Sequence, residues 1–214
     1  MQRLNNQNII KYINSEILND ELFIYLEFIS GGSLKAFTLN KGIKNELIIK
    51  SYINDILNAL SYLHKKGIVH RDIKSDNILI SDDGSLKLTD FSCSGQIIIL
   101  DEVLLEDSDL LDSLKGTLLW MAPEVIRQEN YGRKVDVWSL GCTLLEIIFG
   151  GNPWGNIKIE NYFQALYKIG KSNEIPCIPN DISDKLKNFI ECCVERDKNK
   201  RKSVEELQNH PFLK

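Results

Sequence analysis

Residues 68–91 read IVHRDIKSDNILISDDGSLKLTDF, and this stretch decides both the expected fold and the expected chemistry. Four of its side chains suit phosphoryl transfer. Asp72 can accept the proton of an attacking hydroxyl, and Lys74 can neutralise charge on a transferred phosphate. Asn77 and Asp90 offer the hard oxygen ligands that Mg²⁺ takes together with substrate phosphates.

The spacing of these four residues has a mechanical reason. A short loop holds the first three side chains together. Two short apolar strands, residues 77–80 and 86–89, are joined by a turn at Asp82-Asp83-Gly84. The hairpin is therefore expected to bring Asp90 back beside Asn77.

Further motifs accompany these residues in a fixed order. His70-Arg71-Asp72 precedes Asn77 by five positions, and Asp90-Phe91-Ser92 closes the stretch. The motifs downstream are Gly116-Thr117, Ala122-Pro123-Glu124, the run DVWSLG at residues 136–141, and Arg201. This ordered set resembles the eukaryotic protein kinase domain, in which such motifs form the catalytic loop, the magnesium-binding motif and the end of the activation segment. Lys74 together with Thr117 resembles the serine/threonine branch of that family.

The resemblance implies an α+β, protein-kinase-like fold over residues 1–214. Residues 1–27 are similar to the last strands of a kinase N-lobe, residues 28–34 to the hinge between the lobes, and residues 35–214 to the mainly helical C-lobe. A partial N-lobe β-sheet is therefore expected.

The family's cofactors are ATP and Mg²⁺, so the resemblance assigns a nucleotide site around the hinge. The backbone C=O of Glu27 and the N–H and C=O of Ile29 would meet the adenine edge. Leu26 would guard the pocket behind the base, Leu79 would form its apolar floor, and Ser33 would also line the site. Without the catalytic loop, the neighbouring Gly31-Gly32 would be read simply as a loop before a helix.

Other residues take supporting roles by the same resemblance. Thr117 would hydrogen-bond Asp72 and Lys74 while it shapes the substrate pocket. The family's buried ion pair between the activation segment and the C-terminal helices corresponds to Glu124 and Arg201. The carboxylate that accepts backbone N–H bonds from the catalytic loop around His70-Arg71 corresponds to Asp136.

Residues 90–124 form the expected regulatory segment, and six acidic residues lie between Asp101 and Asp112. Such a run is either a solvated, mobile loop or part of a regulatory element. Ser113 lies three residues before Gly116, where the family often carries an activating phosphate, and Arg71 would be the partner of that phosphate. Ser113 could equally be an ordinary polar loop residue.

Apolar periodicity predicts the remaining elements. Strands are expected at 8–13 and 22–27, with a turn at 14–20. Helices are expected at 34–37, 46–66, 134–149, 161–169, 183–194 and 203–210. The helix at 134–149 is apolar nearly all round and should be the buried centre of the bundle.

Composition excludes several classes of protein. The formal net charge of −4 gives no basic stripe, so nucleic acid is not an expected partner. Five cysteines without metal spacing suggest core thiols in a reducing compartment. No apolar run is long enough to span a membrane and Met1 opens no signal peptide, so the default expectation is the cytoplasm, with the oligomeric state open.

Two of the departures from the family pattern bear on the phosphate site and on the activation segment. No Gly-rich loop and no strand Lys occur before Asn8, which leaves open whether Met1 is the true start or the product of a truncated gene model. Ser92 replaces the usual Gly, which narrows the backbone angles available there.

The function that the resemblance implies is ATP-dependent phosphorylation of serine or threonine on a protein. The runs GTLLWMAPEVI at residues 116–126, WSLGCT at 138–143 and ALYKIG at 165–170 are similar to kinases that phosphorylate other kinases at the top of mitogen-activated cascades, so another kinase is the expected substrate. The alternative is a catalytically impaired or pseudokinase interaction module, since the phosphate-covering loop and strand Lys are absent from these residues.

Overall fold

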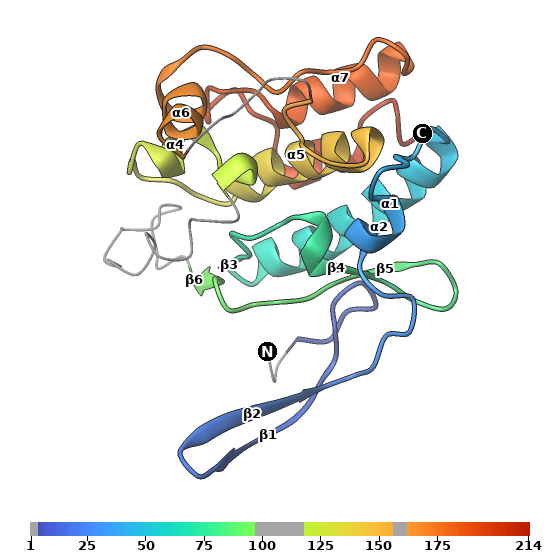
Figure 1. Cartoon of the computed structure of the whole chain (residues 1–214), viewed down its shortest axis with the longest axis vertical. Helices are drawn as coiled ribbons and strands as arrows, with labels where there is room; N and C mark the ends of the chain where they lie inside the picture. The colour runs from blue at the N-terminus through green and yellow to red at the C-terminus, as the bar shows by residue number, and fades with distance from the viewer. Residues whose placement is uncertain (1–3, 97–117, 156–161) are drawn as a thin grey trace.

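The computed structural model describes residues 4–96, 118–155 and 162–214. Figure 1 shows a body of helices packed around α5 (Lys134–Phe149), with short strands along one side and the hairpin of β1 and β2 projecting from it. The centre of the hydrophobic core is α5, where Trp138, Leu140 and Leu144 are completely buried. The buried central helix is therefore where the sequence predicts it.

The helix α2 (Glu46–Lys65) supports the residues that follow it. Its stripe of Ile49, Ile53, Leu60 and other apolar residues is buried, and the Asn45 side chain caps its first turn by accepting the N–H of Leu47. Gly67 has φ of 71°, a left-handed conformation that ends the helix and turns the chain into β3 (Ile68–Val69).

The predicted hairpin after the catalytic loop is confirmed. A 3₁₀ turn (Ser75–Asn77) leads into β4 (Ile78–Ile80), which pairs antiparallel with β5 (Leu86–Leu88). The N–H of Thr89 donates to the C=O of Asn77 at 3.0 Å, which closes the hairpin beside Asp90. Residues 8–10 run parallel to β5, and the N–H of Ile10 donates to the C=O of Leu88 at 2.8 Å.

The prediction for the N-terminal strands was wrong in its boundaries. The strands are β1 (Tyr12–Leu18) and β2 (Glu21–Leu26), and the turn consists of Asn19 and Asp20 alone. Both turn residues have left-handed φ angles, 51° and 64°, which is the geometry of tight two-residue hairpins and is tolerated by Asn and Asp. Neither face of the hairpin is fully buried, so the polar residues at 14–16 fit within a strand and did not mark a turn.

The remaining elements are short. They are α1 (Leu34–Thr38), β6 (Gly95–Gln96), a 3₁₀ turn (Leu118–Trp120), α4 (Pro123–Ile126), α6 (Tyr162–Leu166), a π turn (Tyr167–Lys171), α7 (Asp184–Cys193) and α8 (Val204–Gln208). Ser183 and Ser203 cap α7 and α8 with their side chains, which explains why these helices begin where the sequence suggests. The predicted helix at 161–169 changes into the π turn after Leu166. None of the helices in the described ranges has the length and apolar character needed to cross a bilayer.

Candidate active site

The loop that follows β3 is held in place by the buried carboxylate of Asp136 on α5. Its Oδ2 accepts the N–H of His70 at 3.0 Å, and its Oδ1 accepts the N–H of Arg71 at 2.9 Å. The ring of His64 lies 2.8 Å from the same carboxylate. Burial acts to raise the pKa of Asp136, but the hydrogen bond with His64 and the surrounding donors lower it below its usual value. Arg71 has φ of 68°, so these bonds hold a left-handed residue at the start of the loop.

The loop then brings Asp72, Lys74 and Asn77 into direct contact. One oxygen of Asp72, Oδ2, accepts from the Lys74 ammonium at 2.9 Å and from the Asn77 amide nitrogen at 2.7 Å. The Asp72 side chain is buried, yet its Oδ1 has no hydrogen-bond partner among the described residues. One oxygen is thus fixed in position while the other can accept a proton from a hydroxyl.

The same contacts orient Asn77. Its amide nitrogen donates to both the side chain and the backbone C=O of Asp72, the latter at 3.0 Å. The amide oxygen therefore points away from Asp72 and accepts no hydrogen bond from the described part of the chain. A neutral oxygen held in this way fits a magnesium ligand.

Asp90 follows β5 in a left-handed conformation, with φ of 58°. The hydroxyl of Ser92 donates to Asp90 Oδ1 at 2.6 Å and the Ser92 N–H donates to it at 3.2 Å, and these bonds lower the pKa of Asp90. Ser92 itself is not in the left-handed region, so the expected restriction at this position does not strain the backbone. The ring of Phe91 packs on His70, with 4.9 Å between ring centroids.

The hinge residues leave backbone groups available. The N–H of Glu27 donates to the C=O of Lys11 at 2.9 Å, whereas the backbone hydrogen bonds of the described residues use neither the N–H nor the C=O of Ile29. Leu79 is partly exposed on β4 and forms a single bridge with Ser33, whose Oγ accepts the N–H of Ala36 as the cap of α1. Leu26 ends β2 just before the hinge.

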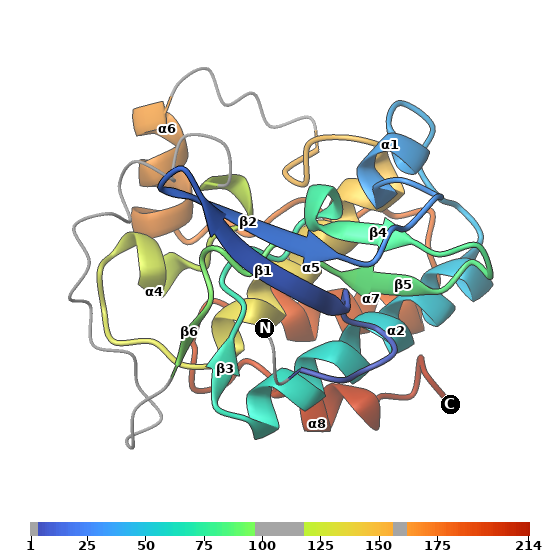
Figure 2. The same ribbon diagram turned by 90° about the horizontal axis from the view of Figure 1, so that it is seen from below.

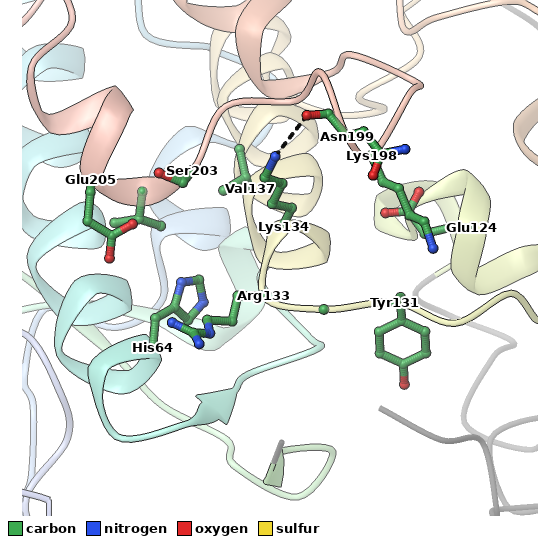
Figure 3. A pocket seen from close by; sticks show the side chains of 12 residues that line it. His64, Glu124, Tyr131, Arg133, Lys134, Val137, Lys198, Asn199, Ser203 and Glu205 are labelled. Carbon is green, nitrogen blue, oxygen red and sulfur yellow. Dashed lines mark hydrogen bonds between the residues drawn. The ribbon is translucent and has the colours of Figure 1, made fainter. Parts of the chain in front are cut away.

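Glu124 and Arg201 form a buried, bidentate ion pair. Arg201 Nη1 lies 2.6 Å from Glu124 Oε1 and Nη2 lies 3.0 Å from Oε2, and both side chains are almost completely buried. Arg201 also donates to the C=O groups of Glu195 and Lys134. Glu124 also lines a neighbouring cavity of about 430 Å³. Lys134 lines the same cavity, and its ammonium donates to the C=O of Asn199 at 3.2 Å, as the dashed line in Figure 3 marks. The pair thus ties α4 to the segment before α8.

The sequence analysis missed Glu146, a buried carboxylate on α5. It accepts the N–H and the hydroxyl of Ser75, at 3.2 and 2.5 Å, and the indole N–H of Trp120 at 3.0 Å. These bonds join the catalytic loop to the 3₁₀ turn before α4. Burial raises the pKa of Glu146. Glu146 is the only charged residue in the stretch 137–149 of this buried helix, and that was the signal that could have found it.

The remaining assigned residues are placed only in part. Ser113, Thr117 and the acidic run at 101–112 lie outside the described residues. The Arg71 guanidinium lies over the ring of Tyr131, 5.7 Å from its centroid, and its Nε has no hydrogen-bond partner within the described ranges. No group of three acidic, His or Cys side chains that could hold a metal occurs in those ranges. A metal here would take Asn77 and Asp90 and complete its shell with phosphates and water.

Comparisons with known proteins place these features in a family. Mitogen-activated protein kinase kinase kinase 3 of Arabidopsis thaliana is 39% identical over 215 residues, which cover 100% of this chain and 34% of the relative. Mitogen-activated protein kinase kinase kinase A of Dictyostelium discoideum is 39% identical over 214 residues, which cover 100% of this chain and 22% of the relative. Serine/threonine-protein kinase PAK 1 of Mus musculus is 40% identical over 216 residues, which cover 100% of this chain and 37% of the relative.

The chain spans between 22% and 37% of the length of these relatives. A family model described as the protein kinase domain matches residues 1–213. The sequence motifs had indicated the same assignment, and the chain belongs to the protein kinase domain family.

Proposed function

We propose that this chain transfers the γ-phosphoryl group of ATP to a serine or threonine hydroxyl of a protein. The observation that carries the proposal is the arrangement around Asp72: one oxygen is fixed by Lys74 and Asn77, and the other is unpartnered among the described residues. A carboxylate in this state can orient a hydroxyl and take its proton as the phosphoryl group is transferred.

The other residues supply position and charge. Lys74 lies beside Asp72 and would neutralise charge that develops on the transferred phosphoryl group. Asn77 and Asp90 would hold Mg²⁺, which, when bound, neutralises the nucleotide phosphates. Glu27 and Ile29 would bind adenine through the backbone, with Leu26, Ser33 and Leu79 lining the base. We propose that Thr117 contacts Asp72 and Lys74, and that phosphate on Ser113 pairs with Arg71.

The proposed substrate is another kinase in a signalling cascade. Its support is the similarity to relatives named mitogen-activated protein kinase kinase kinases, which covers the whole chain. The similarity to PAK 1 is as high. The alternative that the experiment must exclude is therefore a substrate from a different group of proteins. The interaction-module alternative gains no support, because a scaffold needs none of the contacts that fix Asp72.

The experiment is a transfer assay with the 214-residue chain, radiolabelled ATP and Mg²⁺. The substrate is a MAP kinase kinase that carries an inactivating substitution, and myelin basic protein serves as a generic substrate for comparison. We expect label on Ser or Thr of the MAP kinase kinase, at a rate above that on the generic protein. Label on neither protein would contradict the proposed activity, and faster labelling of the generic protein would contradict the proposed substrate.

A further inference from the structure

A second polar pocket, of about 570 Å³, lies beside the hinge and away from the phosphoryl-transfer residues. Its walls are the hinge residues, the turn between β4 and β5, and Asp55 on α2. Figure 2 shows β5 beside α2, and the N–H of Leu86 donates to Asp55 at 2.9 Å across this contact. None of Asp72, Lys74, Asn77 and Asp90 lines the pocket.

The pocket contains a buried acceptor that no described residue satisfies with a hydrogen bond. Asn8 lines it and is only 2% exposed. Its amide nitrogen donates to the C=O of Leu86 at 2.9 Å, whereas its Oδ1 has no hydrogen-bond partner in the described part of the chain. The hydroxyl of Ser81, another lining residue, is also buried and unpartnered there. Because an unsatisfied buried acceptor is costly, the pocket is suited to a ligand that brings N–H or O–H donors.

The charge of the pocket is strongly negative. Four lining residues are acidic, namely Glu27, Asp55, Asp82 and Asp83, and Lys87 is the one basic residue among them. Lys87 is already paired with Glu27 at 2.9 Å. Burial raises the pKa of Asp55, so a bound cation would also relieve the cost of its charge. The ligand should therefore be positively charged.

The rim of the pocket is aromatic. Phe28 lines it and is 90% exposed, the largest exposed fraction among the large hydrophobic side chains of the described residues. These residues include no cluster of acidic groups close enough to hold a metal ion. Dispersed acceptors beside an aromatic ring instead fit a guanidinium group, which carries five donors in a planar fork and stacks on aromatic faces.

We propose that this pocket, formed by Asn8, Phe28, Asp55, Asp82 and Asp83, binds an arginine side chain presented by an extended basic segment of a partner protein. The guanidinium donates to Asn8 Oδ1 and the acidic wall, and Phe28 covers its face. Glu27 and Ile29, whose backbone groups are proposed to bind adenine, also line this pocket, but Asp72, Lys74, Asn77 and Asp90 do not, so the site is a docking surface and not part of the transfer centre.

The test measures binding without nucleotide, so it stands whether or not the chain proves to be a kinase. A fluorescein-labelled peptide, Gly-Arg-Arg-Gly-Leu-Gly, is titrated with the 214-residue chain by fluorescence anisotropy. A second peptide has citrulline, a neutral isostere, in place of both arginines. The variants are Asp55→Asn with Asp82→Asn, and Phe28→Ala, which changes an exposed side chain and leaves the fold intact. The control is Glu191→Gln with Glu205→Gln, which removes the same charge elsewhere.

We expect the arginine peptide to bind and the citrulline peptide not to bind. The acidic double variant should weaken binding roughly 10-fold to 100-fold, as expected for charge-assisted hydrogen bonds, and Phe28→Ala by roughly 3-fold. The control variant should bind as the wild type does. Equal binding of the two peptides, no binding of either, or equal losses in the acidic and control variants would overturn the proposal.

Discussion

At the scale of single residues, the site depends on which oxygen of each side chain is already used. Oδ2 of Asp72 accepts hydrogen bonds from Lys74 and Asn77. Because the Asn77 amide nitrogen faces Asp72, its amide oxygen points away from Asp72. The residue types were predictable from the sequence because their spacing is tight. The choice of oxygen was not, because it follows from contacts that only the folded loop makes.

The metal ligands should differ in their effects. Asp90→Ala should abolish the Mg²⁺-dependent part of nucleotide binding, because it removes a charged ligand. Asn77→Ala should weaken that part less, because it removes a neutral one. The measurement is titration of a fluorescent nucleotide with and without Mg²⁺. Unchanged Mg²⁺-dependent affinity in Asp90→Ala would show that Asp90 is not a ligand.

Ser92 should control the pKa of Asp90. The Ser92 hydroxyl is the largest cause that lowers this pKa, so Ser92→Ala should raise it toward the ordinary value for Asp. Because the folded-state pKa is lowered, the stabilisation by Asp90 is present above its unfolded pKa and is lost as the pH falls through the folded value. NMR titration of the Asp90 carboxyl carbon measures the folded-state pKa of Asp90, as the midpoint of the titration, in the wild type and in Ser92→Ala. The same midpoint in both proteins would exclude the Ser92 hydroxyl as the cause.

At the scale of elements, α5 organises the site through two carboxylates on one helix. Asp136 holds the start of the catalytic loop, and Glu146 holds its end together with Trp120. The bounds of α5 and the hairpin of β4 and β5 were predicted because buried apolar runs have a clear signature. The strand β1 was placed wrongly because its faces are exposed and carry no such signature.

The ion pair between Glu124 and Arg201 should be strongly coupled. Glu124→Ala or Arg201→Ala alone should lower the free energy of unfolding by about 3–5 kcal/mol, because each leaves an opposite charge buried. The double variant should lower the free energy of unfolding by less than the sum of the two single effects. A matched control is the exposed pair of Lys44 and Asp181, for which each loss should be far smaller. Urea denaturation measures all of these, and additive losses at the buried pair would contradict the coupling.

At the scale of the whole molecule, the hairpin of β1 and β2 stands out from an otherwise well-packed body (Figure 1). Ile17, Leu22 and Ile24 are 72%, 63% and 50% exposed, and their alternation and cross-strand pairing place them on one face. An exposed apolar face on a two-stranded sheet favours association with other chains.

The 214-residue chain should therefore self-associate through this hairpin. Ile17→Lys with Ile24→Lys should increase the fraction of monomer in sedimentation velocity experiments. The control is Leu47→Lys, a change at a side chain on α2 that is 77% exposed, which should have little effect. An equal increase in the monomer fraction in the control variant would contradict the prediction, because it would mean that added charge at any exposed site reduces the association.

The central claim is that Asp72 acts as the base of a phosphoryl transfer, and its most direct test is the transfer rate of Asp72→Asn. The variant keeps the size of the side chain but cannot accept the proton. Turnover should fall by roughly 10²-fold to 10⁴-fold, while the affinity for nucleotide stays nearly the same. The rate is measured with radiolabelled ATP on the MAP kinase kinase substrate, and the affinity with a fluorescent nucleotide. Near-normal turnover in Asp72→Asn would contradict the account.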